Sequence, residues 1–248
     1  MTGGASGMGR LVVNRLLAKE VEVIAVDRNA DALAGLPDHD RLRTEPVDVT
    51  DDRAVQALAE RIAGESGPVD RLVLAAGIAS GGPLLDEERQ RFRATMEVNY
   101  LGVVNWVRAV APGMAERGSG EIVIFASTAG WVPTSAMAGY CASKAALVSF
   151  SESIAIELEP QGVRVVALCP PAVKTPMLDD FVSAGALPRK GLEYFKPIAP
   201  EVVVDAIEPA LKGRKIFCFP GRGTATIQRA RRFAPGLTRR ALRFFDDG

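Results

Sequence analysis

Short apolar runs alternate with longer amphipathic stretches along most of the chain. The apolar runs are nearly continuous and rich in β-branched residues, which is typical of strands covered on both faces of a parallel sheet. The stretches between them have apolar positions at helical spacing. This alternation predicts one doubly wound, mostly parallel α/β sheet flanked by helices. The predicted strands are residues 21–26, 43–49, 69–75, 122–125, 163–168 and 215–219, and the predicted helices are 11–17, 51–63, 86–117, 137–159 and 199–212.

A glycine-rich turn, residues 2–9, precedes the first predicted helix. In a doubly wound sheet such a turn follows a central strand, and here only Met1 comes before it. We therefore expect the first strand to be missing or truncated. Either the natural chain begins earlier than this sequence, or the fold manages without most of one strand. An empty central position would leave two ladders unpaired, which favours the first alternative.

The chain is long enough for one large domain, and its 48% of hydrophobic residues suffice for a sizeable core. We predict a domain over residues 1–220, in which residues 177–200 have the mixed composition of a substrate lid. The tail, residues 221–248, is basic and amphipathic. It either touches an anionic membrane surface or packs its aromatic side chains on the domain, and we favour the second.

Composition and charge exclude several classes of protein. The formal net charge is zero, which argues against nucleic acid as a partner, and no apolar run reaches the length of a membrane span. Cys141, Cys169 and Cys218 are odd in number and lack metal-site spacing, so we expect no metal and a cytoplasmic location without a signal peptide. The helix at 137–159 is apolar on most sides, which predicts a homodimer or homotetramer.

The turn at residues 2–9 suits the pyrophosphate of a dinucleotide. Its glycines allow the backbone to approach closely, and the helix behind it offers free N–H groups and a positive dipole end. Asp27, at the end of the next strand, is placed to bond both ribose hydroxyls of an adenosine and to repel a 2′-phosphate. Ser6, rather than a basic residue, precedes the next glycine. NAD is therefore favoured over NADP. NADP stays an alternative, because Arg28 follows Asp27 directly.

Tyr140 and Lys144 lie four positions apart on a predicted helix, and so on one face of it. An unperturbed phenol has a pKa near 10, and a neighbouring cation lowers it, which suits a general acid/base. Ser127 follows a buried strand and is placed to donate a hydrogen bond to the same substrate oxygen. Asn99 is a poor helix former inside the predicted helix 86–117, and its simplest role is to bond backbone and kink that helix.

These residues together resemble the signature of the short-chain dehydrogenase/reductase family over essentially the whole chain. The resemblance implies a Rossmann-type, NAD(P)-dependent oxidoreductase that acts on an alcohol/ketone pair. The chain departs from the family pattern at residues 74–77, where two asparagines are absent, and at Pro171, which replaces a glycine. The matching residues are Thr2-Gly3-x-x-x-Gly7-x-Gly9, Asp27, Asp48-Val49, Asn99, Ser127, Tyr140-x-x-x-Lys144 and Pro170 to Thr175.

The resemblance also implies a role for each site residue. Tyr140 is the general acid/base, and Lys144 lowers its pKa and holds the nicotinamide ribose. Ser127 positions the substrate oxygen, and Asn99 keeps a water in a proton relay. Val173 and Thr175 orient the carboxamide end of the cofactor. Cofactor contacts are implied for Gly3, Ser6, Gly7, Met8, Gly9, Asp27, Asp48, Val49, Ala75, Ala76, Gly77, Tyr140, Lys144, Pro170, Val173 and Thr175; for Asp48 a turn-forming role is equally open.

We therefore predict an NAD-dependent alcohol dehydrogenase or ketoreductase of a moderately hydrophobic small molecule. The alternatives are a non-catalytic NAD(P)-sensing or scaffold protein of the same fold, and an epimerase or dehydratase on the same scaffold. The substrate pocket is expected from residues 78–86, 131–137 and the lid. Its apolar lining, some of which belongs to the core in the competing interpretation, would be Trp131, Val132, Met137, Met177, Leu178 and Phe181.

Overall fold

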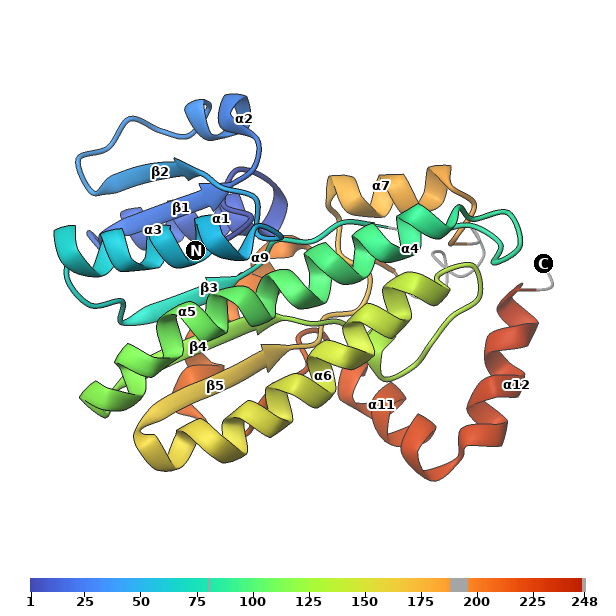
Figure 1. Cartoon of the computed structure of the whole chain (residues 1–248). Coiled ribbons are helices and arrows are strands. Elements are labelled where there is room, and N and C mark those ends of the chain that lie inside the picture. The colour runs from blue at the N-terminus through green and yellow to red at the C-terminus, as the bar shows by residue number, and fades with distance from the viewer. Residues whose placement is uncertain (80, 188–195, 247–248) are drawn as a thin grey trace.

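The sheet is parallel throughout, as the alternation of elements predicts (Figure 1). The computed structural model describes residues 1–79, 81–187 and 196–246, with side chains up to residue 240. Two sets of strands pair separately, in the orders β1-β2 and β3-β4-β5-β6. The strands are β1 (Val23–Asp27), β2 (Leu42–Pro46), β3 (Arg71–Leu74), β4 (Gly120–Phe125), β5 (Val163–Leu168) and β6 (Phe217–Cys218).

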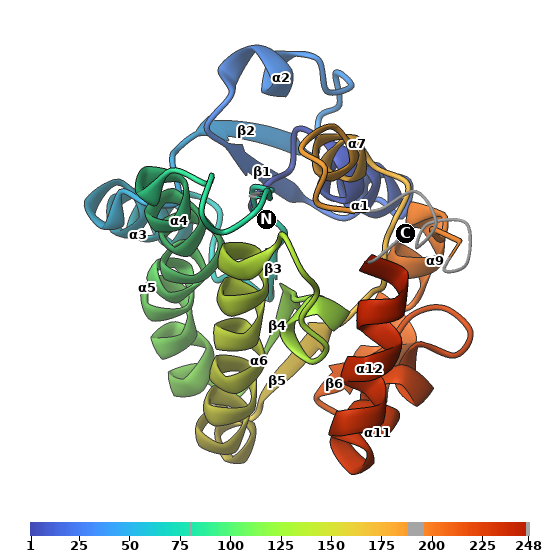
Figure 2. The same ribbon diagram turned by 90° about the vertical axis from the view of Figure 1, so that its right-hand side faces the viewer.

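Helices cover both faces of the sheet (Figure 2). One core joins α3 (Asp52–Glu65), α5 (Gly102–Arg117) and α6 (Ala138–Leu158) to one face, and a second joins α1 (Gly7–Leu17), α9 (Pro200–Asp205) and α10 (Ile207–Lys212) to the other. Strand β4 shows why its residues form a strand. Ile122 and Ile124 point into the first core, and Val123 and Phe125 point into the second. The remaining described α-helices are α2 (Ala30–Ala34), α4 (Arg89–Met96), α7 (Pro176–Ser183), α11 (Thr224–Phe233) and α12 (Pro235–Asp246).

Met1 and Thr2 lie between β1 and β3, at the position expected for the first strand. Thr2 forms parallel bridges to Val26 of β1 and to Leu74 of β3, so this one residue joins the two sets of strands. Its N–H donates to the Val73 carbonyl at 2.9 Å, and the Met1 carbonyl accepts from the Val26 N–H at 2.8 Å. The glycine turn is thereby held at the carboxyl edge of the sheet.

The stretch predicted to be helical at 86–117 is helical from Arg89 to Arg117. A π-helical turn, Glu97–Leu101, separates α4 from α5. Asn99 lies at its centre with no exposed surface. A π turn inserts one residue into a helix and is often found at functional sites. The insertion rotates Asn99 into the core, where its side-chain amide bonds the backbone of Ile78.

The basic tail forms α11 and α12, which lie beyond β6 (Figure 2). The favoured prediction, that the tail packs its aromatic side chains on the domain, is wrong for Phe233, which is 80% exposed. Leu237 is likewise exposed. The reason is geometric, because α12 packs on α11 rather than on the sheet layers. Within the described part of the chain, no helix is both long and apolar enough to cross a membrane.

Candidate functional site

The polar residues singled out from the sequence gather at the carboxyl edge of the sheet. Asp27 ends β1, residues 75–77 follow β3, and Ser127 follows β4. In parallel sheets this edge is where ligands bind. Tyr140 and Lys144 reach the same edge from the first turns of α6. The structure therefore brings together residues that lie far apart in the chain.

The turn at residues 3–9 has room only for glycine at two positions. A Cβ at Gly9 would lie 1.9 Å from the Gly3 carbonyl oxygen, and one at Gly3 would lie 2.7 Å from the Ala76 nitrogen. Gly3 and Gly7 also have positive φ angles, +65° and +49°. A Cβ at Gly7 would meet open space, so the turn presents bare backbone to a pocket. The free N–H groups of α1 begin at this point, which suits an anion.

A pocket of about 320 Å³ opens beside this turn. Its wall combines the glycine turn, the end of β1, the residues after β3 and the start of α7. This combination fits a dinucleotide, because it offers a helix N-terminus, a carboxylate and close backbone along one surface. Twelve of the predicted cofactor residues line it: Gly3, Ser6, Gly7, Met8, Gly9, Asp27, Asp48, Val49, Ala75, Ala76, Gly77 and Thr175.

The two aspartates in this wall already make local bonds. Asp27 accepts from the Asn29 N–H at 3.1 Å and from the Ala5 N–H at 3.3 Å, so it ties the glycine turn to β1. Asp48 accepts from the N–H and the hydroxyl of Thr50. Asp48 therefore forms a turn, one of its two predicted roles, and faces the pocket as well.

Tyr140, Ser127 and Lys144 form one buried cluster. The Tyr140 hydroxyl is hydrogen-bonded to the Ser127 side chain. The Lys144 Nζ donates to the Phe125 carbonyl at 2.7 Å and lies 5.6 Å from the centroid of the Tyr140 ring. The tyrosine and lysine side chains therefore share one face of α6, as their spacing predicts.

Burial sets the proton affinities of this cluster. It raises the pKa of Tyr140 to about 12, although the Ser127 hydrogen bond acts to lower it. Burial also lowers the pKa of Lys144 to about 8. The prediction that Lys144 lowers the Tyr140 pKa is not what this geometry gives. Loss of hydration is the largest cause of the rise in the Tyr140 pKa, because the phenol is buried.

Asn99 ties the cluster to the loop after β3. Its Oδ1 accepts from the Ile78 N–H at 2.8 Å, while its Nδ2 donates to the Ile78 carbonyl and to the Ser143 hydroxyl, both at 3.1 Å. Ser143 in turn donates to the Tyr140 carbonyl. This confirms that Asn99 bonds backbone. The side chain thus fixes the first turn of α6 relative to β3.

The three predicted residues after β5 have different surroundings. The Pro170 carbonyl accepts from both the N–H and the hydroxyl of Thr128, which holds the loop that carries Ser127. Val173 is buried in the second core, so it supports the edge from below. Thr175 lines the pocket and precedes α7. Neither Pro170 nor Val173 is part of the pocket wall.

An apolar cluster covers Tyr140. The Phe181 ring of α7 meets the Tyr140 ring edge-on at 4.9 Å, and Met137 and Met177 pack against the same group. Trp131 does not join them. It is partly buried and packs on Phe217 at 4.9 Å, against the first core, so its role in the substrate pocket stays a prediction. The predicted lid includes residues 188–195, which lie outside the described residues.

Sequence reasoning missed several contributors. Ser143 was not singled out, although it joins Asn99 to α6. Ile78 acts through its backbone, and Val98 lines the dinucleotide pocket with an apolar side chain; Met177, predicted for the substrate pocket, lines the dinucleotide pocket too. A serine three positions after the tyrosine is a signal for Ser143, since a helical serine often donates to a carbonyl one turn back. The others carry no local signal.

Comparisons with known proteins identify relatives of this chain. A family model described as short chain dehydrogenase matches residues 1–185. The chain is 35% identical to the 2-dehydro-3-deoxy-L-rhamnonate dehydrogenase (NAD(+)) of a Sphingomonas species, over 81% of this chain and 79% of that protein. It is also 35% identical to the 2,3-dihydro-2,3-dihydroxybenzoate dehydrogenase of Bacillus subtilis, over 71% and 70% of the two chains.

A solved structure agrees with the sequence relatives. The chain is similar to a short-chain dehydrogenase from Burkholderia cenocepacia in complex with NADP, with a TM-score of 0.83 and 28% identity. The similarity covers 97% of this chain and 94% of that one. It therefore extends over the sheet, both helical layers and the region after α7.

Proposed function

The chain belongs to the short-chain dehydrogenase/reductase family, and from this premise we propose that it transfers hydride between NAD(H) and an alcohol/ketone pair. It is an oxidoreductase of the dehydrogenase type. The observation that carries the more detailed proposal is the buried cluster of Tyr140, Ser127 and Lys144, which Met177 links to the dinucleotide pocket. That cluster offers a proton donor and a second hydroxyl at one point.

In this proposal Tyr140 exchanges a proton with the substrate oxygen. NAD(H), when bound, supplies the hydride chemistry. With a pKa of about 12 the phenol is protonated near neutral pH, which suits donation to a carbonyl oxygen during reduction. Ser127 bonds the same oxygen and orients it, and Lys144 provides the adjacent positive charge. Asn99 keeps Tyr140 in place through Ser143, and a water held by Asn99 remains a prediction.

We propose NAD rather than NADP as the cofactor. The support is Asp27, whose carboxylate lies in the pocket wall beside the glycine turn and would repel a 2′-phosphate. Arg28 also lines the pocket, and its positive charge would attract the 2′-phosphate of NADP. Both cofactors occur among the related proteins, since the Sphingomonas dehydrogenase has NAD(+) in its name and the Burkholderia structure is a complex with NADP.

The proposed substrate is moderately hydrophobic. Met137, Met177 and Phe181 surround Tyr140, so a molecule that reaches the phenol passes apolar side chains. We place its entry at a lid over residues 177–200 in a catalytic domain of residues 1–220, with 221–248 as a separate tail. We also propose that the enzyme is cytoplasmic, which agrees with its three free thiols. We further propose that it assembles as a homodimer or homotetramer through the outer face of α6, where Ile156 is 71% exposed.

Fluorescence titration with NADH, and with NADPH for comparison, tests the cofactor assignment. We expect tighter binding of NADH, and Asp27→Asn should reduce the preference. Equal affinities in the parent chain would refute the role of Asp27.

Replacement of Tyr140 by Phe tests the chemistry. The ring and its contact with Phe181 remain, so folding and NADH binding should be unchanged, while turnover falls by about 10²–10⁴-fold because a positioned acid/base is lost. Unchanged turnover would refute the mechanism. Net oxidation of NADH with a ketone separates this function from an epimerase or dehydratase, which returns the cofactor unchanged. Binding of NADH without turnover of any ketone or alcohol would favour the non-catalytic alternative.

A further inference from the structure

The two tail helices, α11 and α12, form a helical hairpin on the outside of the molecule (Figure 1 and Figure 2). We refer to these two helices as the tail hairpin. At its turn the Arg231 guanidinium donates to the Pro235 carbonyl at 3.4 Å, and the Thr238 hydroxyl donates to the Ala234 carbonyl at 3.0 Å. Side-chain hydrogen bonds therefore hold the turn between the helices.

One side of α11 is directed towards the domain. Thr224 is buried, and its hydroxyl donates to the Pro220 carbonyl at 2.8 Å. Ile227 and Arg231 are partly buried. Thr224, Ile227 and Arg231 are three and four positions apart, so they lie on one side of the helix. This side attaches α11 to the rest of the protein and leaves its opposite side to the solvent.

The opposite side of α11 is exposed and mixes apolar with basic side chains. Four exposed residues on it have the same helical spacing: Thr226, Arg229, Ala230 and Phe233. Leu237, near the start of α12, is 71% exposed. It comes four residues after Phe233, so at most about 14 Å of chain separates the two Cα atoms. Both large apolar side chains are therefore exposed beside the turn of the tail hairpin.

The exposed arginines of the tail hairpin carry charge that the protein does not neutralise. Within the part of the chain that the structure describes, four of them form no ion pair: Arg229 and Arg232 of α11, and Arg239 and Arg240 of α12. A guanidinium can bond a phosphate through two parallel hydrogen bonds. These four side chains are therefore suited to an external anion that carries phosphate.

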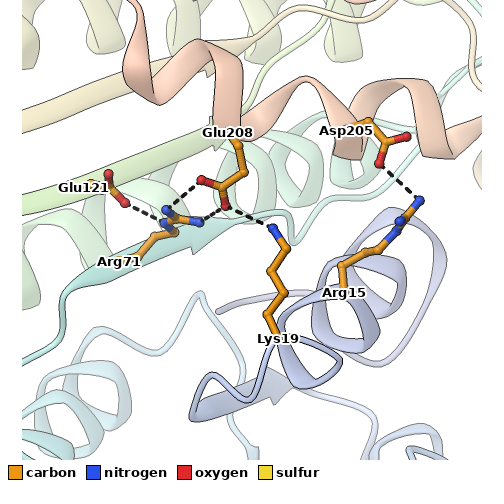
Figure 3. A network of polar contacts seen from close by, with 6 residues as sticks. All are labelled: Arg15, Lys19, Arg71, Glu121, Asp205 and Glu208. Atoms are coloured by element: carbon orange, nitrogen blue, oxygen red, sulfur yellow. Dashed lines mark hydrogen bonds and ion pairs between the residues drawn. The ribbon is translucent and has the colours of Figure 1, made fainter.

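Arginines elsewhere in the structure are matched by carboxylates (Figure 3). Arg71 of β3 pairs with Glu121 of β4 at 2.6 Å and with Glu208 of α10 at 2.7 Å. Arg15 of α1 pairs with Asp205 of α9 at 3.1 Å. In these pairs the positive charge is balanced inside the protein, which makes the unbalanced charge of the tail hairpin a local feature.

Charge is also divided unevenly along the sequence. Residues 209–245 contain ten basic residues and no acidic one. Because the whole chain has 30 of each kind, the remainder has 20 basic and 30 acidic residues, which is a net charge of −10. An anionic surface would therefore attract the tail hairpin and repel the rest of the domain. This asymmetry favours one orientation, with the tail hairpin towards the surface.

We propose that the exposed side of α11 and the start of α12 bind the surface of an anionic lipid bilayer. Phe233 and Leu237 enter the boundary between the headgroups and the acyl chains, and the unpaired arginines bond lipid phosphates. The binding is peripheral and reversible, because the apolar part of the surface is small and the charge contribution is screened by salt.

The mixture of side chains favours a bilayer over a nucleic acid. Binding to nucleic acid rests on basic side chains at phosphates, and sites for single strands add aromatic side chains for base stacking. Leu237 and Ala230 offer no surface for stacking. Apolar side chains exposed among arginines are instead typical of helices that lie at a membrane interface.

Sedimentation of the full chain with lipid vesicles tests the proposal without cofactor or substrate. One set of vesicles is phosphatidylcholine alone, and the other contains about 30% phosphatidylserine, whose headgroup is anionic. We expect the chain to bind the second set only. Binding should weaken between about 0.1 M and about 0.5 M salt, because the charges are then screened.

Four variants separate the apolar contribution from the charge. Phe233→Ser and Leu237→Ser should each weaken binding to the anionic vesicles about tenfold, because an apolar side chain no longer leaves water. Arg229→Gln and Arg232→Gln should each weaken it about fivefold, because one basic residue near the surface is lost. All four side chains are exposed, so the unfolding temperature should stay that of the parent chain.

Two matched controls remove the same residue types elsewhere on the surface. Leu85→Ser removes a leucine that is 95% exposed and is followed by three acidic residues. Arg53→Gln removes an exposed arginine of α3. Neither should change binding to the anionic vesicles. Equal losses in the controls and in the tail variants would mean that binding does not involve the tail hairpin.

Three further results would overturn the proposal. One is binding to neither set of vesicles, or equal binding to both. Another is binding to double-stranded DNA as tight as that to vesicles, with no effect of Phe233→Ser, which would indicate a nucleic-acid site. The third is self-association of the parent chain that Phe233→Ser abolishes, which would mean that a second copy covers this face. None of these results depends on hydride transfer, so the proposal stands or falls separately from the function proposed above.

Discussion

Replacement of Lys144 by Met should remove a rise in stability with pH. Burial lowers the pKa of Lys144 to about 8 from its ordinary 10.5. Between these values the unfolded chain holds the proton and the folded chain does not. Because the unfolded state then binds more protons, the free energy of unfolding increases with pH across this window. Methionine has a similar length and does not titrate.

The size of the effect follows from the same two pKa values. From about pH 7 to about pH 9.5, the difference in proton binding integrates to about 2 kcal/mol in favour of the folded state. The lost hydrogen bond to the Phe125 carbonyl shifts the variant at every pH and leaves its slope unchanged. Burial raises the pKa of Tyr140 from its ordinary 10.0 to about 12, and because Tyr140 is present in both the parent and the variant, its titration cancels in their comparison.

Urea unfolding of the parent chain and the Lys144→Met variant at both pH values is the assay. The quantity of interest is the change in the free energy of unfolding between the two pH values in the parent, minus the same change in the variant. Ordinary titration of surface groups and of the cysteines cancels in this comparison. Parallel pH profiles would refute the reasoning, since they would mean that Lys144 is hydrated in the folded protein.

Two further predictions concern the glycine turn and the ion pairs. Gly9→Ala should abolish NADH binding and lower the unfolding temperature, because its Cβ would lie 1.9 Å from the Gly3 carbonyl oxygen. Its control is Gly64→Ala in α3, where the new Cβ meets open space. That change should raise the free energy of unfolding by about 0.5–1 kcal/mol. A destabilised Gly64→Ala chain in a thermal-shift assay would contradict this. Glu208→Gln should lower the free energy of unfolding in urea by about 1 kcal/mol or less, because its ion pair with Arg71 is partly exposed. A double-mutant cycle with Arg71→Met measures the coupling energy of the pair. A larger loss of stability would contradict the argument from exposure.

Hydrophobic patterning was sufficient for the sheet and for the residues at its carboxyl edge. Strand β5 has the predicted bounds, since its valines face two cores, and Asp51 caps α3 by accepting from the Ala54 N–H. The glycine turn and Asp27 were found because their chemistry is local. Such features need no knowledge of distant neighbours.

The features that the sequence did not reveal depend on contacts between distant residues. The π turn follows from Asn99, whose partner Ile78 lies 21 residues away. The ring contact between Trp131 and Phe217 was not foreseen because Phe217 is on another strand. The direction of the Tyr140 pKa shift depends on burial, which spacing along a helix does not reveal.

The pocket beside the glycine turn has walls from both sets of strands. Ala5 and Asp27 belong to the side that carries β1, and Ala75 and Gly77 to the side that carries β3. A ligand in this pocket therefore contacts both sets of strands at once. Among the described residues, Thr2 alone forms β-bridges to both sets. By mass action, ligand at about 100 times its Kd adds about 2.7 kcal/mol to the stability of the folded state. Binding of the cofactor and the stability of the sheet are thus thermodynamically linked.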